Sequence, residues 1–208
     1  DKDDHIYALA AMNRVLEGDK QLPTGGETLF KVKAGAAEII STSKKLPLPI
    51  AKAARPDRPV DVAGRGISGA WIEGAEWMYG GVGFDGNTSG GCACWNARFA
   101  LDLLGRSFAT ELGRFRVAVL DTNGNLILRI GKYGNVDDGA PLIKEGGPPN
   151  PRSVGGDEVA LFHPSYVATH SDRRLFIADY GNYRVLSVKL GYHATETVAL
   201  RDIADKER

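Results

Sequence analysis

The stretch Leu175-Phe176-Ile177-Ala178-Asp179-Tyr180-Gly181-Asn182-Tyr183-Arg184-Val185 has an earlier copy in the same chain. The copy, Ser107-Phe108-Ala109-Thr110-Glu111-Leu112-Gly113-Arg114-Phe115-Arg116-Val117, lies 68 positions upstream and aligns without a gap. The matched positions comprise two aromatic pairs, an acidic pair, a glycine pair and a repeated Arg-Val: Phe108 and Phe176, Phe115 and Tyr183, Glu111 and Asp179, Gly113 and Gly181, Arg116-Val117 and Arg184-Val185. A repeated strand–turn–strand unit predicts a stacked or circular architecture in which each unit covers its neighbours.

Each copy predicts four short strands joined by tight turns. Gly181 and Asn182 can adopt positive φ in the turn between the second and third strands of the last copy. The sequence Asp121-Thr122-Asn123-Gly124-Asn125 is the clearest hairpin signal in the chain. The expected strands are residues 166–169, 175–178, 184–189 and 195–200 in the last copy, and 99–103, 107–110, 116–120 and 126–130 in the preceding one.

A weaker third copy opens the chain, and further strand-like sequence follows it. Its expected strands are residues 28–33 and 38–41, and because it begins at a turn, we infer that Asp1 is not the natural start of the fold. A Pro-rich stretch at 46–65 reads as an extended connection, residues 71–82 as strand, and the Gly- and Pro-rich 136–158 as an inserted loop. The expected organisation is therefore a single domain with blade-like units at about 1–45, 66–90, 95–135 and 160–202.

Bulk composition narrows the classes of function. The 208 residues include 26 basic and 26 acidic side chains, and a formal charge of zero argues against a general role in binding nucleic acids. No apolar run approaches the roughly 20 residues that span a bilayer. Asp1-Lys2-Asp3-Asp4 lacks the basic start and apolar core of a signal peptide.

These residues resemble NHL repeats, a family of β-propeller blades. The family pattern is a Pro-led first strand, an apolar strand that ends in Ala-Asp, a Gly-Asn turn and Arg-Val, which here correspond to Pro164, Phe176-Ile177-Ala178-Asp179, Gly181-Asn182 and Arg184-Val185. In the preceding copy Asn96 replaces the Pro. The segment Cys92-Ala93-Cys94-Trp95-Asn96-Ala97-Arg98-Phe99, followed by Asp121-Thr122-Asn123-Gly124-Asn125-Leu126, also resembles uncharacterised secreted NHL-type proteins of bacteria. The resemblance implies an all-β propeller and a secreted or periplasmic location.

The resemblance also implies an incomplete ring. Propellers close with typically 4–8 four-stranded blades, and three or four are recognisable in this sequence. Open rings expose long sheet edges, which proteins avoid. We therefore expect missing blades or a protein partner to complete the ring.

Cys92 and Cys94 are the sharpest local feature. Two thiolates this close can share a soft metal ion such as Cu(I) or Zn(II), or form a strained, redox-active disulfide. They can equally be two small buried hydrophobic residues. A structural zinc site normally uses four ligands, and the chain has only these two cysteines.

The histidines and carboxylates give further candidates. His163 and His170 flank one predicted strand and could contribute to a metal site in a central channel. Amidating lyases, which share this architecture, bind zinc through a histidine after the blade-opening Pro; here Ser165 holds that position, so the resemblance does not extend to lyase chemistry. Because Glu111 and Asp179 repeat together with Arg116 and Arg184, we interpret the two carboxylates as structural, either accepting turn amides or pairing with the two arginines.

Two polar clusters complete the candidates. An aromatic–acidic group could bind sugars or cations, or pack between blades: Trp71, Glu73, Glu76, Trp77 and Tyr79. Four oxygen-bearing residues near the inserted loop could hold Ca²⁺, although their spacing fits no EF-hand: Asn135, Asp137, Asp138 and Asp157.

We expect a non-catalytic binding or assembly module that presents propeller-face loops to a protein or small ligand. One alternative is a metal-dependent lactonase or lyase that uses the central channel. Another is a redox or metal accessory protein that uses Cys92 and Cys94. No phosphate-binding glycine loop, nucleophile elbow or metalloprotease helix is present in the sequence.

Overall fold

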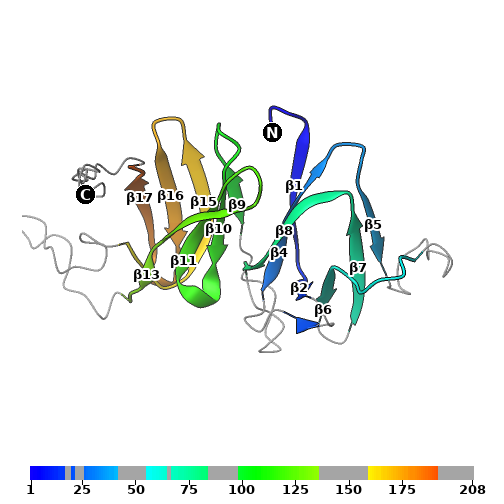
Figure 1. Ribbon diagram of the computed structural model, residues 1–208. Helices are drawn as coiled ribbons and strands as arrows, with labels where there is room; N and C mark the ends of the chain where they lie inside the picture. Colours follow the sequence, from blue (N-terminus) through cyan, green and yellow to red (C-terminus); the bar gives the residue numbers. More distant parts are fainter. Residues whose placement is uncertain are drawn as a thin grey trace, which may run out of the picture.

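The computed structural model describes residues 1–16, 20–21, 26–41, 55–64, 67–83, 98–135 and 159–191. These residues form an all-β structure of several, mostly antiparallel sheets (Figure 1). The four larger sheets have the orders β1-β4-β8, β3-β2-β6-β7-β5, β12-β11-β10-β9 and β15-β16-β17. The strands of the first two are β1 (His5–Ala10), β2 (Asn13–Leu16), β3 (Lys20–Gln21), β4 (Glu27–Lys33), β5 (Glu38–Ser41), β6 (Val62–Gly64), β7 (Ile67–Glu73) and β8 (Ala75–Val82).

The 68-residue sequence repeat is also a structural repeat. Phe99 pairs with Ala109 in the four-stranded sheet, and the equivalent Val167 pairs with Ile177 in the three-stranded sheet. In both copies a three-residue 3₁₀ turn links the second and third strands: η2 (Leu112–Arg114) and η4 (Tyr180–Asn182). The strands are β9 (Phe99–Leu101), β10 (Ser107–Glu111), β11 (Arg116–Leu120) and β12 (Leu126–Ile130), then β15 (Pro164–His170), β16 (Arg174–Asp179) and β17 (Arg184–Lys189).

Two local expectations differ from the structure at these repeats. Positive φ falls on Tyr183 (50°) and on the equivalent Phe115 (57°), whereas Gly181 and Asn182 keep negative φ within the 3₁₀ turn. The left-handed residue lets its N–H close the turn onto the carbonyl of Leu112 or Tyr180. The first strand of the earlier copy ends at Leu101 rather than 103, because the Asp102 side chain starts a turn there.

The N-terminal strands are divided between two sheets. The expected strand 71–82 is broken at Gly74, which has φ +75° and no room for a Cβ beside the carbonyl oxygen of Ala36. Beyond this corner, β8 pairs with β4, while β7 pairs with β5 and β6. The segments expected as units 1–45 and 66–90 therefore contribute strands to both sheets, instead of forming one sheet each.

Three apolar layers hold the four larger sheets in one stack. Phe30 on β4 packs with Val62 and Ile72 of the five-stranded sheet. The other side of the three-stranded β1-β4-β8 sheet meets the repeat, where Leu29 and Val82 pack with Ala109 and Leu120. The third layer joins the two copies and contains Phe108, Val117, Val119, Leu161, Val167, Leu175 and Ile177. Figure 1 shows these sheets side by side.

A short parallel pair, β13 (Lys132–Tyr133) with β14 (Ala160–Leu161), lies beside the last layer. Leu161 belongs to the layer between the two copies, so this pair closes one side of it. The expected fourth strand at 195–200 and the whole of the expected loop at 136–158 lie outside the described residues. In the described part of the chain, no helix has the length and apolar character to cross a membrane.

Candidate ligand-binding cleft

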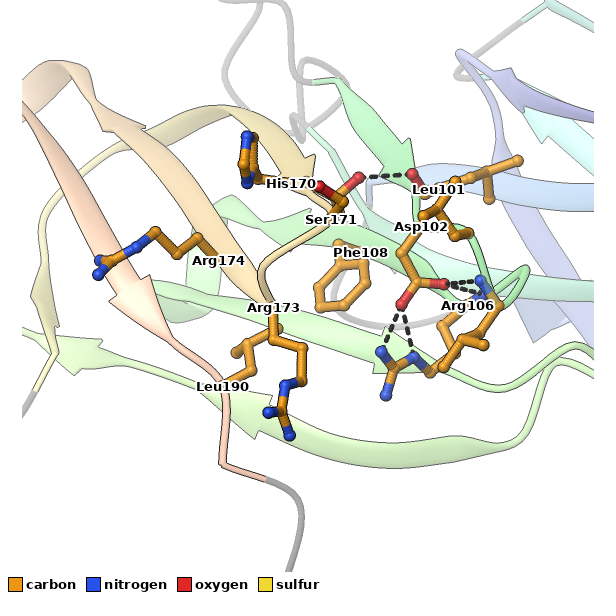
Figure 2. A pocket seen from close by; sticks show the side chains of 12 residues that line it. Leu101, Asp102, Arg106, Phe108, His170, Ser171, Arg173, Arg174 and Leu190 are labelled. Atoms are coloured by element: carbon orange, nitrogen blue, oxygen red, sulfur yellow. Dashed lines mark hydrogen bonds and ion pairs between the residues drawn. The ribbon is translucent and has the colours of Figure 1, made fainter.

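Two equivalent turns from the two copies meet around a cleft of ≈ 410 Å³ (Figure 2). One turn, residues 102–106, joins β9 to β10, and the other, residues 170–174, joins β15 to β16. A hydrogen bond from Thr169 Oγ1 to the carbonyl oxygen of Leu101 (2.6 Å) ties the two strands that lead into these turns. The lining residues are Leu101, Asp102, Leu103, Leu104, Arg106, Phe108, Thr169, His170, Ser171, Arg173, Arg174 and Leu190.

The first turn is built by Asp102. Its Oδ1 accepts hydrogen bonds from the backbone N–H groups of Leu104 and Arg106 (both 2.9 Å), and its Oδ2 accepts one from Arg106 Nε (2.7 Å). Gly105 provides the positive φ (+74°) that the turn needs. This geometry leaves Leu103 and Leu104 80% and 68% exposed at the tip.

The second turn presents a cation. Arg173 has φ 63°, and its N–H donates to the carbonyl oxygen of His170 (3.1 Å). Arg174 is held by Asp172 (3.1 Å) and by Ser187 (3.0 Å). Within the described ranges, the guanidinium of Arg173 has no hydrogen-bond or ion-pair partner, and Figure 2 shows it beside Leu190.

The cleft therefore combines apolar surface with positive charge. Three arginines line it against one carboxylate, that of Asp102, which is already paired with Arg106. A second hollow of ≈ 340 Å³ on the other side of the first turn includes Asp1 and Asp3 and is the more acidic of the two. The tip Leu103-Leu104 lines both hollows. The larger one is suited to a ligand with an anionic group on an apolar body.

The two candidate histidines do not meet. His163 precedes β15, and its ring centroid lies 6.4 Å from that of Tyr180. His170 is the last residue of β15, and its Nδ1 is hydrogen-bonded to Asp172 Oδ1 (2.7 Å). A seven-residue strand separates them by roughly 20 Å. Burial lowers the pKa of His163, and the nearby Asp179 carboxylate only partly opposes this effect. Across the described residues, no three histidine, cysteine or acidic side chains gather closely enough to hold a metal.

The aromatic–acidic cluster is divided between two sheets. On β7, buried Trp71 donates to the carbonyl oxygen of Arg58 (2.9 Å), and Glu73 pairs with the same arginine (2.6 Å). On β8, Glu76 bridges His5 (2.9 Å) and Lys31 (2.8 Å). The five residues are thus divided between β7 and β8, and each of the two acids pairs with a cation of the protein.

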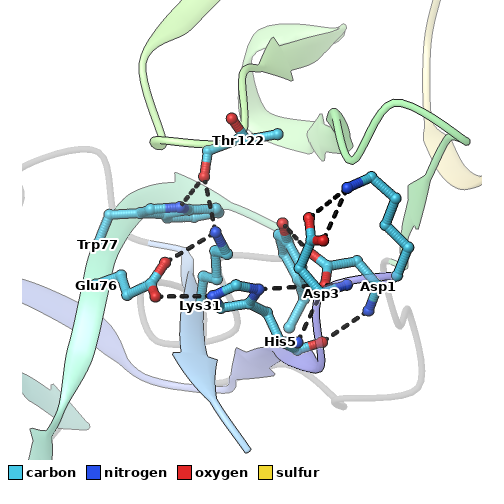
Figure 3. Close-up of polar contacts among 9 residues, drawn as sticks. Asp1, Asp3, His5, Lys31, Glu76, Trp77 and Thr122 are labelled. Carbon is cyan, nitrogen blue, oxygen red and sulfur yellow. Dashed lines mark hydrogen bonds and ion pairs between the residues drawn. The ribbon is translucent and has the colours of Figure 1, made fainter.

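Trp77 and Lys31 join the N-terminal sheets to the repeat. Both donate to the carbonyl oxygen of Thr122, at 3.0 and 3.2 Å (Figure 3). Thr122 belongs to the hairpin turn between β11 and β12. Trp77 thus takes part in packing between sheets, which is one of the roles predicted for the aromatic–acidic group.

The repeated carboxylates both pair with the repeated arginines. Buried Asp179 accepts the backbone N–H groups of Phe162 (3.0 Å) and His163 (2.8 Å) on one oxygen, and Arg184 lies 3.4 Å from the other. Glu111 pairs with Arg116. The turn geometry of each copy is thus fixed by a buried carboxylate at the end of its second strand.

Several candidates lie outside the described residues: Cys92, Cys94, Asp137, Asp138 and Asp157. Of the proposed Ca²⁺ ligands, only Asn135 is described. Leu103, Leu104 and Arg173 are not among the candidate residues that the sequence patterns predicted. Two consecutive leucines directly before a turn glycine were the available signal, because a turn exposes such side chains.

No protein-family model and no curated protein matches this chain. The resemblance to NHL repeats therefore depends on the quoted residues alone.

Proposed function

We propose that this protein is a non-catalytic binding module built from propeller-type blades. The proposal is supported by the stacking of the four larger sheets, in which an apolar layer lies between each sheet and the next. Two of these sheets also repeat strand, turn and register at a 68-residue interval. NHL-type blades have this organisation, with faces covered by neighbours and loops exposed at the ends.

The same proposal includes a further blade, from another segment or a protein partner, on the outer face of the β15-β16-β17 sheet. Val117, on the equivalent face of the four-stranded sheet, is fully buried, whereas its counterpart Val185 is 69% exposed in the described structure. Tyr166 on the same outer face is also exposed. An apolar face of this kind is typical of a surface that another protein element covers.

The ligand site of the module is the cleft between the equivalent turns. The observation that carries this assignment is that one turn offers two exposed leucines and the other an arginine without a partner in the described residues. Apolar area and one unpaired guanidinium select a ligand that has an aliphatic or aromatic body and a carboxylate or phosphate group.

Binding of octanoate and octan-1-ol to the full chain, measured by calorimetry, tests the assignment. We expect octanoate to bind at least about tenfold more tightly than octan-1-ol, because a hydrogen-bonded charge contributes on the order of 1.5–3 kcal/mol. Arg173→Gln should remove this preference, and Leu103→Asn should weaken both ligands. Lys33→Gln, at the exposed end of β4, makes the same charge change elsewhere and serves as the control. Equal binding of the two ligands, or an unchanged preference in Arg173→Gln, contradicts the site.

A further inference from the structure

Three arginines converge on one buried carboxylate at the other end of β10 from the cleft. Glu111, the last residue of β10, is 1% exposed. Arg116 and Arg129 (Nε, 3.1 Å) both donate to its Oε2, and Arg114 Nη1 lies 3.7 Å from its Oε1. Tyr79 donates its hydroxyl to the same Oε1 (3.2 Å) and accepts a hydrogen bond from Arg129 (3.2 Å).

The second copy of the repeat shows that the fold does not need all three arginines. Asp179, the equivalent of Glu111, is satisfied by two backbone N–H groups, by Arg184 and by Asn182 (2.6 Å). Asn182 occupies the position that corresponds to Arg114 in the first copy. One arginine in each copy therefore completes the structural pair, and Arg114 and Arg129 are additions particular to the first copy.

The additions leave positive charge and hydrogen-bond donors in excess. One carboxylate neutralises one of three guanidinium groups, so the cluster carries two net positive charges at neutral pH. Each guanidinium has five N–H donors in a planar fork. Among the described residues, the terminal nitrogens of Arg116 and the Nη2 of Arg114 have no partner.

The cluster is also accessible to solvent. The three arginine side chains are between 28% and 36% exposed, although the carboxylate between them is buried. Burial and the adjacent Glu111 raise the pKa of Tyr79, so its hydroxyl stays protonated as a donor to Glu111 at neutral pH. The carboxylate thus fixes the inner ends of the guanidinium groups, and their outer edges face water.

We propose that Arg114, Arg116 and Arg129 form a binding site for a tetrahedral oxyanion of the phosphate or sulfate class. A dianion matches the two excess positive charges, and arginine forks bind the oxygens of such groups in a bidentate manner. The site is independent of the ligand cleft, because Glu111 and the cleft turn lie at opposite ends of β10. Free phosphate and a phosphate monoester offer the same group to these arginines.

Calorimetric titration of the full chain with inorganic phosphate, at constant ionic strength in chloride, tests the proposal. We expect saturable binding that Arg114→Gln weakens by about tenfold or more, because it removes one charge-assisted contact. Arg114 is the least engaged of the three with Glu111, so this variant should keep the fold, which circular dichroism checks. Lys33→Gln, at the exposed end of β4, makes the same charge change away from both proposed sites and should leave phosphate binding unchanged.

A second titration, with phenyl phosphate, separates the two sources of the anion. Tighter binding of the monoester than of inorganic phosphate identifies a substituted phosphate as the ligand, and equal or weaker binding identifies the free ion. The proposal is overturned if phosphate does not bind above the chloride reference, or if Arg114→Gln binds phosphate as the unmodified chain does. It is also overturned if Arg173→Gln alone abolishes binding, since the ion then lies in the cleft.

Discussion

At the scale of single residues, two aromatic residues adopt a backbone conformation, positive φ, that is usually found at glycine. Phe115 and Tyr183 have φ of 57° and 50° at equivalent positions after their 3₁₀ turns. The left-handed region costs an L-residue on the order of 1 kcal/mol. Phe115 offsets the cost by packing its ring on Tyr133 (4.8 Å) and Phe162 (6.3 Å), whereas Tyr183 is largely exposed. The conformation is thus imposed by the turn, and ring packing supports it fully in only one copy.

His163 is the residue whose protonation we expect to affect stability. Burial holds its pKa below the ordinary 6.5, so the folded protein resists a proton that the unfolded chain accepts. Its contribution to stability is present above pH 6.5 and is lost as the pH falls from there through the lowered pKa. His163→Gln should therefore show a smaller fall in melting temperature between pH 7.5 and 5.5 than the unmodified chain, as measured by circular dichroism.

His170→Gln is the control for this pH dependence. His170 is the exposed last residue of β15, at the opposite end of the strand from His163, and it contacts Asp172. This variant should keep the full fall in melting temperature that the unmodified chain shows. Equal falls in the unmodified chain and His163→Gln would show that the burial of His163 does not influence unfolding.

At the scale of elements, the two copies share their strand pairing but differ in what covers them. Phe108 on β10 pairs with Val119, and Phe176 on β16 pairs with Ser187 at the equivalent place. Phe108 is fully buried under the β15-β16-β17 sheet, whereas Phe176 is only half-buried, on the outer face of that sheet. A phenylalanine at the same register position is therefore fully buried in one copy and half-exposed in the other.

Alanine substitution at these matched positions measures this difference. We expect Phe108→Ala to lower the free energy of unfolding by about 3–5 kcal/mol, the cost of a cavity in a closed layer. Phe176→Ala should cost about 1–2 kcal/mol, because less apolar area is withdrawn from water. Denaturant unfolding followed by circular dichroism gives both values. Similar losses would contradict an uncovered outer face and would favour a further element packed upon it.

Local patterns in the sequence predicted the strands of the repeat well. Alternating residues and the Asp-Thr-Asn-Gly-Asn signal placed β11, β12 and β17 at their observed bounds, because strand and turn preferences act over a few residues. The division of the N-terminal strands between two sheets was not predictable in this way. It depends on the corner at Gly74 and its approach to Ala36, a contact between segments far apart in sequence.

The candidate cleft was less accessible to sequence reasoning than the strands. The turns were expected, but the meeting of residues 102–106 with 170–174 depends on how the two sheets pack. The sequence pattern pointed instead to the acidic and aromatic residues of β7 and β8. The carboxylates of these strands pair with cations of the protein itself. Leu103 and Arg173 belong to no sequence motif. They are candidates because Leu103 is exposed and the Arg173 guanidinium has no partner among the described residues.

At the scale of the whole molecule, each of the four larger sheets depends on its neighbours. The β9–β12 sheet is covered on both faces, by Leu29 and Val82 on one side and by Leu175 and Ile177 on the other. Trp77 and Lys31 add polar contacts to Thr122 across the first of these boundaries. In a stacked array of this kind, stability is approximately the sum of the unit and boundary contributions, and strong boundaries make unfolding cooperative.

Leu175→Ala tests whether the four sheets unfold together. Leu175 is fully buried between the two copies, so its truncation should cost about 2–5 kcal/mol and lower the melting temperature by about 2–4 °C per kcal/mol. Trp71 lies in the five-stranded sheet, whereas Trp77 contacts Thr122 of the repeat, so a Trp77→Phe and Trp95→Phe background limits the tryptophan signal to the N-terminal part. If the stack is one cooperative unit, tryptophan fluorescence and far-UV circular dichroism should report the same lowered transition, because coincident probes indicate two-state unfolding. A fluorescence transition that stays in place while the circular dichroism transition falls or splits would show that the N-terminal sheets are stable without the repeat.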